Sequence, residues 1–416
     1  MCSQVPFLFE SNDQQCLTTQ DNGSRTQLVL NLTPKTADEI GLTGYAAKMF
    51  PLANLALAND DQLGAAIIQA GAPVAGVPLT QAQGQALYQK IYSQFAPNVT
   101  GASRALAIAL TDQATGPVAA RQRALRMYAG QPGDTTLWGQ EFNISLNAEA
   151  DANTIGYRDT GFGFVLGMDG GDPANGRYGG ALSFYSGNIN EKQPRTSKTN
   201  SEWALLTGYS DWRGRGLFFD TQLSVGVGQL DGKRTLDVGT IKRTAEGKRA
   251  ALLGAIGATT GVILTMGSTV FTPLVSLDGL AMREEGYTEH GGGDPASGDA
   301  FDLKVAPTYY DSARIFAGAN LRQDFNLGDF YLQPEARAGY RYDFISDAEK
   351  VKASFASTPG TNFTLTGPDP AQGNLVAGGS IAATTGAWSI GVNYDYIRGN
   401  NGSLSQEGTI SLIGRI

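Results

Sequence analysis

The chain has few charged residues, one histidine and no long apolar run, and each shortage excludes a class of protein. Charged residues are 17% of 416, and a net charge of -8 with a pI near 4.9 excludes the basic face that nucleic-acid binding requires. No run of about 18 uncharged apolar residues occurs, so a transmembrane helix has no support. A single histidine excludes a multi-histidine metal site, and we expect no metal, no cofactor and no nucleic-acid partner.

Cysteine is also scarce. Cys2 and Cys16 fit neither a zinc ribbon nor a C-x-x-C redox pair. A disulfide-closed loop in an oxidising compartment and two unbonded thiols both stay open as interpretations. The start of the chain lacks the basic and apolar regions of a secretory signal, so we expect it to be a fragment of a longer protein.

Up to about residue 130 the sequence is rich in alanine and leucine with helical spacing. It predicts helices over 42–72 and 80–95, after a short strand in TQLVLNLTP that ends at Pro34. A further helix is predicted over 100–127, weakened or bent at Gly116 and Pro117. This last helix has small residues nearly all round, and three basic residues lie near its end: Arg121, Arg123 and Arg126.

After a turn at 131–134 the periodicity changes to two, which is typical of strands. In LWGQEFNISLN one face holds Trp138, Phe142, Ile144 and Leu146, and the other holds Gly139, Glu141, Asn143 and Ser145. The pattern recurs in about twelve segments, each long enough for a tilted membrane strand. They are 135–148, 161–170, 177–186, 201–211, 216–229, 247–264, 269–282, 310–325, 330–344, 375–385, 387–398 and 405–416.

The links between these segments alternate between long and short. Short links such as WRGRG, MGS and NLGD follow long ones such as EEGYTEHGGGDPASGDAFDLKV. Outer-membrane barrels show this alternation, with tight turns in the periplasm and longer loops outside. An even strand count then puts the C-terminus on the periplasmic side.

The apolar faces of these strands are too large and aromatic to fill a soluble barrel. Side chains can just fill about eight strands, whereas about twelve enclose more space. We therefore predict that the apolar faces point to lipid and the polar faces to a lumen. The lumen wall would then carry carboxylates, namely Glu141, Asp220, Glu335 and Asp395.

The helix rich in small residues is the candidate occupant of this lumen. We expect its three arginines to meet carboxylates of the wall, without a prediction of the pairs. The alternative is a surface helix packed on the upstream region.

Several tracts carry a resemblance to a family. RTQLVLNLTPKTADEIGLTGYA, QALYQKIYSQFAPNVTGASRALAIALTDQATGPVAARQRALR, LWGQEF, GYRDTGFGFVLGMDGG and NFTLTGPDPAQGNLVAGGSIAATTGAWSIGVNYDY occur in this order over roughly residues 30–416. Together they resemble the β-domain of monomeric autotransporters. The resemblance implies an all-β fold, a twelve-stranded antiparallel transmembrane β-barrel with an N-terminal helical segment and a helix in its lumen.

The resemblance also implies a function and a division of the chain. Residues 1–98 would be the end of a passenger, 99–130 a linker helix threading the barrel, and 131–416 the translocator domain in the bacterial outer membrane. The barrel would export and anchor an N-terminal passenger at the cell surface by type V secretion. Its partners would be outer-membrane lipid, the barrel-assembly machinery, periplasmic chaperones and its own passenger, and we expect a monomer.

Two features depart from the family pattern. Family members usually end in Phe or Trp, whereas this chain ends in GTISLIGRI, which keeps an apolar alternation as the expected assembly signal: Ile410, Leu412 and Ile416. The paired asparagines at which one subgroup cleaves itself are missing from 100–127.

Two other functions are weighed. A polar lumen would also suit an open porin. A barrel-borne hydrolase would have one candidate constellation, His290 with Asp294 or Asp302 at the barrel rim, but no G-x-S-x-G nucleophile motif accompanies the HGGG string. We expect a protein that is not an enzyme and has no catalytic residue.

Overall fold

The computed structural model describes residues 5–10, 17–21, 26–30, 32–125, 135–150, 154–172, 176–192, 197–293, 300–386 and 388–415, and the side chains of all of these except 17–21, 26–30, 114–125 and 415. Cys2, Cys16, Arg126, Asp294 and Ile416 lie outside the described residues, as do the side chains of Arg121 and Arg123.

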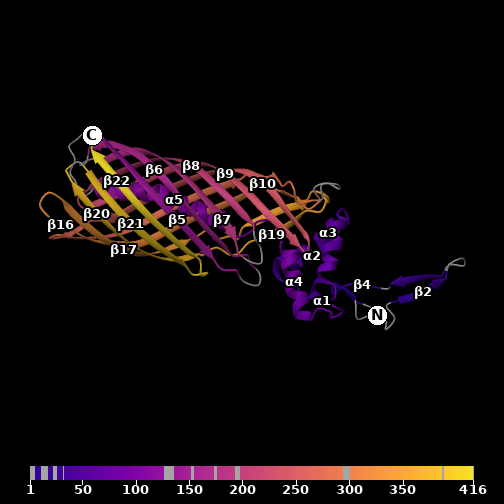
Figure 1. Ribbon diagram of the computed structural model, residues 1–416. Helices are drawn as coiled ribbons and strands as arrows, with labels where there is room; N and C mark the ends of the chain where they lie inside the picture. The colour runs from indigo at the N-terminus through magenta and orange to yellow at the C-terminus, as the bar shows by residue number, and fades with distance from the viewer. Residues whose placement is uncertain are drawn as a thin grey trace.

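Twelve long antiparallel strands close into a barrel (Figure 1). In chain order they are β5 Thr136–Ala148, β6 Tyr157–Asp172, β7 Gly176–Glu191, β8 Lys198–Gly214, β9 Leu217–Val238, β10 Ile241–Val262, β12 Thr269–Glu284, β15 Thr308–Gln323, β17 Tyr331–Asp343, β20 Gly373–Thr385, β21 Trp388–Gly399 and β22 Leu404–Arg415. Short strands β11 (Leu264–Met266) and β16 (Phe325–Asn326) pair with β12 and β17.

The barrel is closed by pairing of its first and last strands. β22 pairs with β5 from Arg415 opposite Thr136 to Leu404 opposite Asn147. Every one of the twelve segments predicted from period-two alternation corresponds to one strand, so the predicted fold class is confirmed.

Side-chain direction agrees with the prediction along most strands. On β6, Phe162, Phe164, Leu166 and Met168 are 51–65% exposed, whereas Val165 between them is buried. β9 and β21 show the same outward apolar face, and the polar residues between them point inward. An outward apolar surface on a closed barrel is the arrangement that hydrocarbon favours.

Several links predicted as long loops contain regular structure. β9 and β10 remain paired up to Val238 opposite Ile241, so the predicted loop between them is a tall hairpin. Two other links supply a four-stranded sheet built of β13 Tyr287–Thr288, β14 Leu303–Val305, β18 Lys350–Phe355 and β19 Phe363–Thr366. These residues pair because the hairpin and the sheet bury apolar side chains against the N-terminal region.

The N-terminal region is a small helical unit with two hairpins. It contains β1 Phe9–Glu10 with β4 Thr33–Pro34, β2 Leu17–Asp21 with β3 Thr26–Leu30, and helices α1 Ala37–Ile40, α2 Gly44–Leu57, α3 Asp61–Ala70 and α4 Gln81–Ser93. The single helix predicted over 42–72 is wrong, because Asp60 interrupts it and caps α3 through the backbone N–H of Leu63 at 3.0 Å. No helix in the described part of the chain is both long and apolar enough to cross a membrane.

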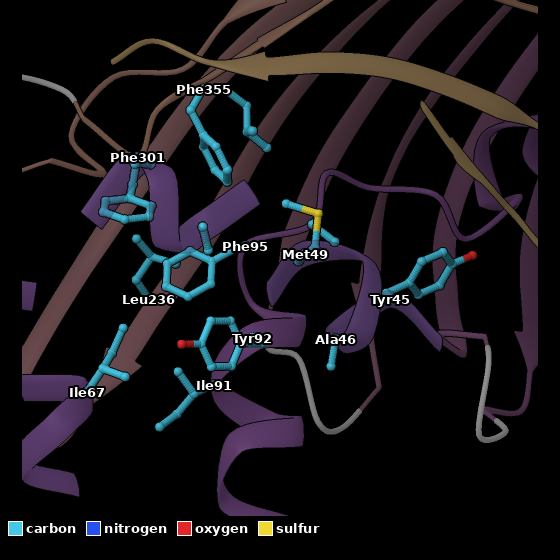
Figure 2. Packing of buried hydrophobic residues seen from close by; sticks show 14 of the residues in the cluster. Tyr45, Ala46, Met49, Ile67, Ile91, Tyr92, Phe95, Leu236, Phe301 and Phe355 are labelled. Carbon is cyan, nitrogen blue, oxygen red and sulfur yellow. The ribbon is translucent and has the colours of Figure 1, made fainter. Parts of the chain in front are cut away.

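This helical unit lies at one end of the barrel, opposite the end that carries the C-terminus (Figure 1). Phe95 follows α4 and contacts Phe301, with ring centroids 4.9 Å apart, in the link between β13 and β14. Figure 2 shows Phe95 among Tyr92, Leu236 of β9 and Phe301. The helices and the outer links of the barrel therefore share one hydrophobic core.

Candidate functional site around the lumen helix

Helix α5 (Ala102–Leu125) lies inside the barrel and runs continuously through Pro117. One side packs on apolar residues of the wall, where Leu106 and Leu110 share a buried cluster with Trp138 and Phe142 of β5. The small side chains of the helix allow this close approach to the wall. The prediction of a helix in the lumen is confirmed.

The position of Trp138 and Phe142 corrects the predicted direction of β5. Trp138, Phe142, Ile144 and Leu146 are at most 5% exposed and face the helix, although their alternation predicted a lipid-facing row. Glu141 therefore points to the lipid side, and its assignment to the lumen wall is wrong. Apolar alternation cannot distinguish a row that faces lipid from a row that faces an apolar plug, because both surfaces exclude water.

On its other side α5 carries an ion-pair network. Asp112 lies between two arginines of the wall, 3.0 Å from the guanidinium of Arg314 on β15 and 2.7 Å from that of Arg341 on β17. The Arg314 side chain is only 4% exposed, so these charges are largely removed from water. Asp112 is the only acidic residue in 100–127, which is the signal that could have identified it in the sequence.

Next to this network the helix makes a second polar contact. Gln113 donates a hydrogen bond from its side-chain amide to the carboxylate of Glu407 on β22. Both side chains are buried, at 3% exposure each. Asp112 and Gln113 thus connect the helix to three strands of the polar half of the wall.

The outer end of α5 is held by a separate group of residues. The guanidinium of Arg104 lies 2.7 Å from the carboxylate of Asp343 and donates to the carbonyl of Ile345 at 2.6 Å. The carboxylate of Glu349 accepts the backbone N–H of Gly101 at 2.9 Å and the hydroxyl of Tyr310 at 3.2 Å. A carboxylate at this position also complements the helix dipole.

Glu349 lies in a link outside the membrane-spanning strands. Burial, together with the negative charge of Glu284, raises the pKa of Glu349 to about 7. The hydrogen bonds from Gly101 and Tyr310 lower it, but they do not compensate for the loss of water.

The predicted wall carboxylates other than Glu141 lie on the inner face. Asp220 is 6% exposed, and Glu335 shares the inner register of β17 with Arg337. Asp395 accepts a hydrogen bond from Nε of Arg337 at 2.6 Å. The side chains of Arg121, Arg123 and Arg126 lie outside the described residues. Their pairing with these carboxylates therefore stays a prediction.

A cavity of about 630 Å³ remains between α5 and the wall near the outer end. It is lined by Ile108 and Asp112 of the helix, Ile397 of β21 and Glu407 of β22, with Glu349 at its rim. The helix therefore occupies the bore without filling its polar half.

The rim residues considered for hydrolysis form a backbone turn. The carboxylate of Asp302 accepts the N–H groups of Gly291 and Gly292, at 3.1 and 2.6 Å. His290 is exposed and its backbone pairs with Glu246. No group of three potential metal ligands occurs among the described residues.

On the final strand, Ile410 and Leu412 each have 52% exposure and point outward, as predicted. Their role as an assembly signal stays a prediction, and Ile416 lies outside the described residues.

Comparison with known proteins assigns the barrel to a family. Residues 137–395, more than half of the chain, match the model described as Autotransporter beta-domain. The fold is similar to the translocator domain of the autotransporter NalP from Neisseria meningitidis, with 16% identity, 74% of this chain and 98% of that chain covered, and a TM-score of 0.54. The β-domain of the Bordetella autotransporter BrkA has 15% identity, covering 67% of this chain and 98% of that chain, with a TM-score of 0.46. A search of curated proteins gives no match. The chain thus belongs to the autotransporter β-domain family.

Proposed function

We propose that this chain exports an N-terminal passenger across the bacterial outer membrane, anchors it there and holds it at the cell surface. Membership of the autotransporter β-domain family makes the barrel an outer-membrane translocator. In this proposal the chain has three parts: residues 1–98 are the end of the passenger, 99–130 are the linker helix and 131–416 are the translocator domain.

One observation supports this division above the others. The chain passes from the helical unit at one end of the barrel directly into α5, whose first turn is held at that end by Glu349 and Arg104. A polypeptide that left the cell through the bore would end in such an arrangement. The barrel end that carries the helical unit would then face the outside.

The test is display of a reporter. An epitope placed before residue 1, behind a secretory signal, is expected to be cut by protease added to intact Gram-negative cells. The same epitope on a chain lacking 99–130 is expected to stay protected, while a heat-dependent gel shift verifies that the barrel has folded. Equal protease sensitivity of both chains would contradict the proposed role of the helix.

Ion conductance separates this function from that of a porin. The intact chain in a planar bilayer is expected to conduct poorly, because α5 occupies the bore, and the chain lacking 99–130 to conduct well. High conductance of the intact chain would contradict the blocking of the bore by α5 and would favour the porin function.

We also propose that assembly uses the barrel-assembly machinery and periplasmic chaperones, with β22 as the recognised strand. Its outward Ile410 and Leu412 support this. Replacing both with Ser is expected to reduce the amount of barrel in the outer membrane, whereas replacing the inward Ser411 with Ala is not.

Finally, we propose that the chain itself is not an enzyme. The bonding of Asp302 to two backbone N–H groups supports a structural role for it. Any hydrolytic activity measured with ester or peptide substrates is expected to be the same in His290→Ala. A loss of activity in that variant would overturn this part of the proposal.

A further inference from the structure

The helical unit contacts the outer part of the barrel at points far along the chain from the link that joins them. The guanidinium of Arg243 on β10 pairs with the carboxylate of Asp60, the residue that caps α3. The hydroxyl of Tyr45 on α2 donates a hydrogen bond to the carbonyl of Thr366 on β19 at 2.8 Å. Because Asp60 and Tyr45 both precede α4 in the chain, α2 and α3 are held on the barrel directly and not only through α4 and α5.

The pair of Asp60 and Arg243 is shielded from water. Its side chains are 0% and 10% exposed, and Nη2 of Arg243 donates to Asp60 at 3.3 Å. A buried carboxylate without a counter-charge is unfavourable, so this pair fixes where α3 lies on β10. Asp60 has two roles, since it also accepts the backbone N–H of Leu63 in the first turn of α3.

Apolar side chains from both sides complete the contact. Leu63, Ile67 and Phe95 of the helical unit share one cluster with Leu236 and Val238 of β9 and Phe301 of an outer link, and each is at most 2% exposed. Figure 2 shows four of them, Ile67, Phe95, Leu236 and Phe301. Separation of the unit from the barrel would expose both sets to water, and contacts this apolar are typical of permanent interfaces.

A further group of polar contacts holds the end of α4. The side-chain amide of Gln94 accepts the backbone N–H of Asp237 on β9 at 2.6 Å and donates to its carbonyl at 3.3 Å. Arg234, only 3% exposed, donates to the carbonyl of Gln94 at 3.0 Å and to that of Phe301 at 2.7 Å. Its charge is paired with Glu289 at 2.5 Å. The contact therefore runs from α2 to the end of α4.

The link and the unit differ in their access to a protease. Val99, Thr100 and Ala102, between α4 and the first turn of α5, are at most 1% exposed. The turn between α3 and α4 is open, with Val74 and Val77 exposed by 73% and 68%. Exposed loop tips are the preferred sites of proteolytic cleavage, so a protease outside the cell would cut at such a turn and not at the link.

We propose that the tall hairpin of β9 and β10, together with the four-stranded sheet of the outer links, is a binding surface that keeps the helical unit on the barrel after the chain is cut. The partner is a helical segment of the exported chain itself, recognised by the charged cap Asp60 and by an apolar face. The proposal rests on the export proposed above. A passenger released by cleavage farther upstream leaves the helical unit behind on the cell surface.

The test uses the full chain, refolded in micelles, with an epitope before residue 1. The recognition sequence of a site-specific protease is inserted between Ala75 and Gly76, in the exposed turn, where insertions are tolerated. After the cut the epitope is captured on a resin, and the barrel is expected to be captured with it. In a matched chain the recognition sequence lies between the epitope and residue 1, and there the barrel is expected to be lost from the resin.

Two substitutions separate docking on the barrel from folding of the unit. Asp60→Asn keeps a side chain that caps α3 but removes the charge opposite Arg243, and Arg243→Ala removes the partner on the barrel. Both leave the contacts between α3 and α4 in place. Each is expected to raise the dissociation constant of the cut fragment, measured by dilution, by roughly tenfold or more. Lys242→Ala, at the exposed neighbouring position on β10, is the matched control and is expected to leave that constant unchanged.

Loss of the barrel from the resin after the cut in the turn would overturn the proposal. Dissociation constants of Asp60→Asn and Arg243→Ala equal to that of Lys242→Ala would also overturn it, since the fragment would then be held by α4 alone. A heat-dependent gel shift verifies that each barrel has folded. The same cut on intact cells tests export separately: the epitope is expected to be cut off from the chain and yet to stay with the cells. Absence of any cut on cells would contradict the proposed export and not the docking measured in micelles.

Discussion

The ion-pair network of Asp112 offers the sharpest test of how the helix is held. In Asp112→Ala the guanidinium groups of Arg314 and Arg341 lose the carboxylate that they share. Their side chains are only 4% and 16% exposed, so little water can replace it. Removing one partner of a buried pair costs about 3–5 kcal/mol, because a charge remains without water or counter-charge. Asp112 lines the lumen cavity and its side chain is 16% exposed, so we expect the lower end of that range, about 3 kcal/mol.

The assay is urea unfolding of the refolded protein in micelles, followed by tryptophan fluorescence. Trp138 packs in the cluster that includes α5 and so reports on the helix. A loss of about 3 kcal/mol in the free energy of unfolding corresponds to roughly a hundredfold change in the equilibrium constant. Conductance of the same variant in a planar bilayer is expected to rise as the helix leaves its position.

The matched control is Glu246→Ala. Glu246 pairs with Lys233 at 2.8 Å, but both side chains are more than half exposed. Such a surface pair contributes less than about 1 kcal/mol. The triple replacement of Asp112, Arg314 and Arg341 by Leu is expected to recover part of the stability lost in the single variant, because the three charges of the network are removed together. A loss in Asp112→Ala no greater than in the control would refute the reasoning.

Three further predictions concern the outer end of α5, the hydrophobic core shared by the helical unit and the outer links, and the packing of α5 on the wall. Since the folded-state pKa of Glu349 is raised to about 7, its contribution to stability is complete below about pH 4.5 and is lost as the pH rises through 7. The unfolding free energy relative to Glu349→Gln should therefore fall by about 3 kcal/mol between pH 4 and pH 8, and a flat difference would contradict the burial of this carboxyl. Phe95→Ala should cost about 3–5 kcal/mol at the shared core, seen as faster protease cleavage of the helical unit with an unchanged barrel gel shift, while Leu55→Ala, at an exposed position, should have little effect. Ala107→Phe, at a helix position with 0% exposure, should prevent close packing on the wall and raise conductance; unchanged conductance would contradict that packing.

Much of the barrel follows from local sequence patterns. Period-two alternation of side chains and the alternation of long and short links locate all twelve strands, because a membrane strand must present one continuous apolar face. Low side-chain bulk in 100–127 favoured a helix in the lumen over a surface helix. These features depend on residues close together in the chain, and they need no knowledge of distant contacts.

The errors share a physical cause. The sequence could not show that Trp138 and Phe142 face α5, because contact with a helix and contact with lipid select the same apolar side chains. Nor could it show that Asp112 meets Arg314 and Arg341, which lie some 200 residues away along the chain. The cluster of Arg121, Arg123 and Arg126 predicted charged contacts with the wall. Asp112 is a single carboxylate among small residues, and no contact was predicted for it.

The sequence by itself therefore determined the class of fold, the number of strands, the presence of the lumen helix and the family. Only the tertiary structure decided which face of β5 points inward, which charges hold the helix and how the outer links become a sheet that packs on the helical unit. The class of fold and the number of strands follow from periodicity and from the requirement that a bilayer imposes on each strand. The lumen helix was predicted from its small residues, and the family from the resemblance of several tracts. What the tertiary structure decided depends on closure of the barrel, which sets residues of the first, middle and last strands around one helix.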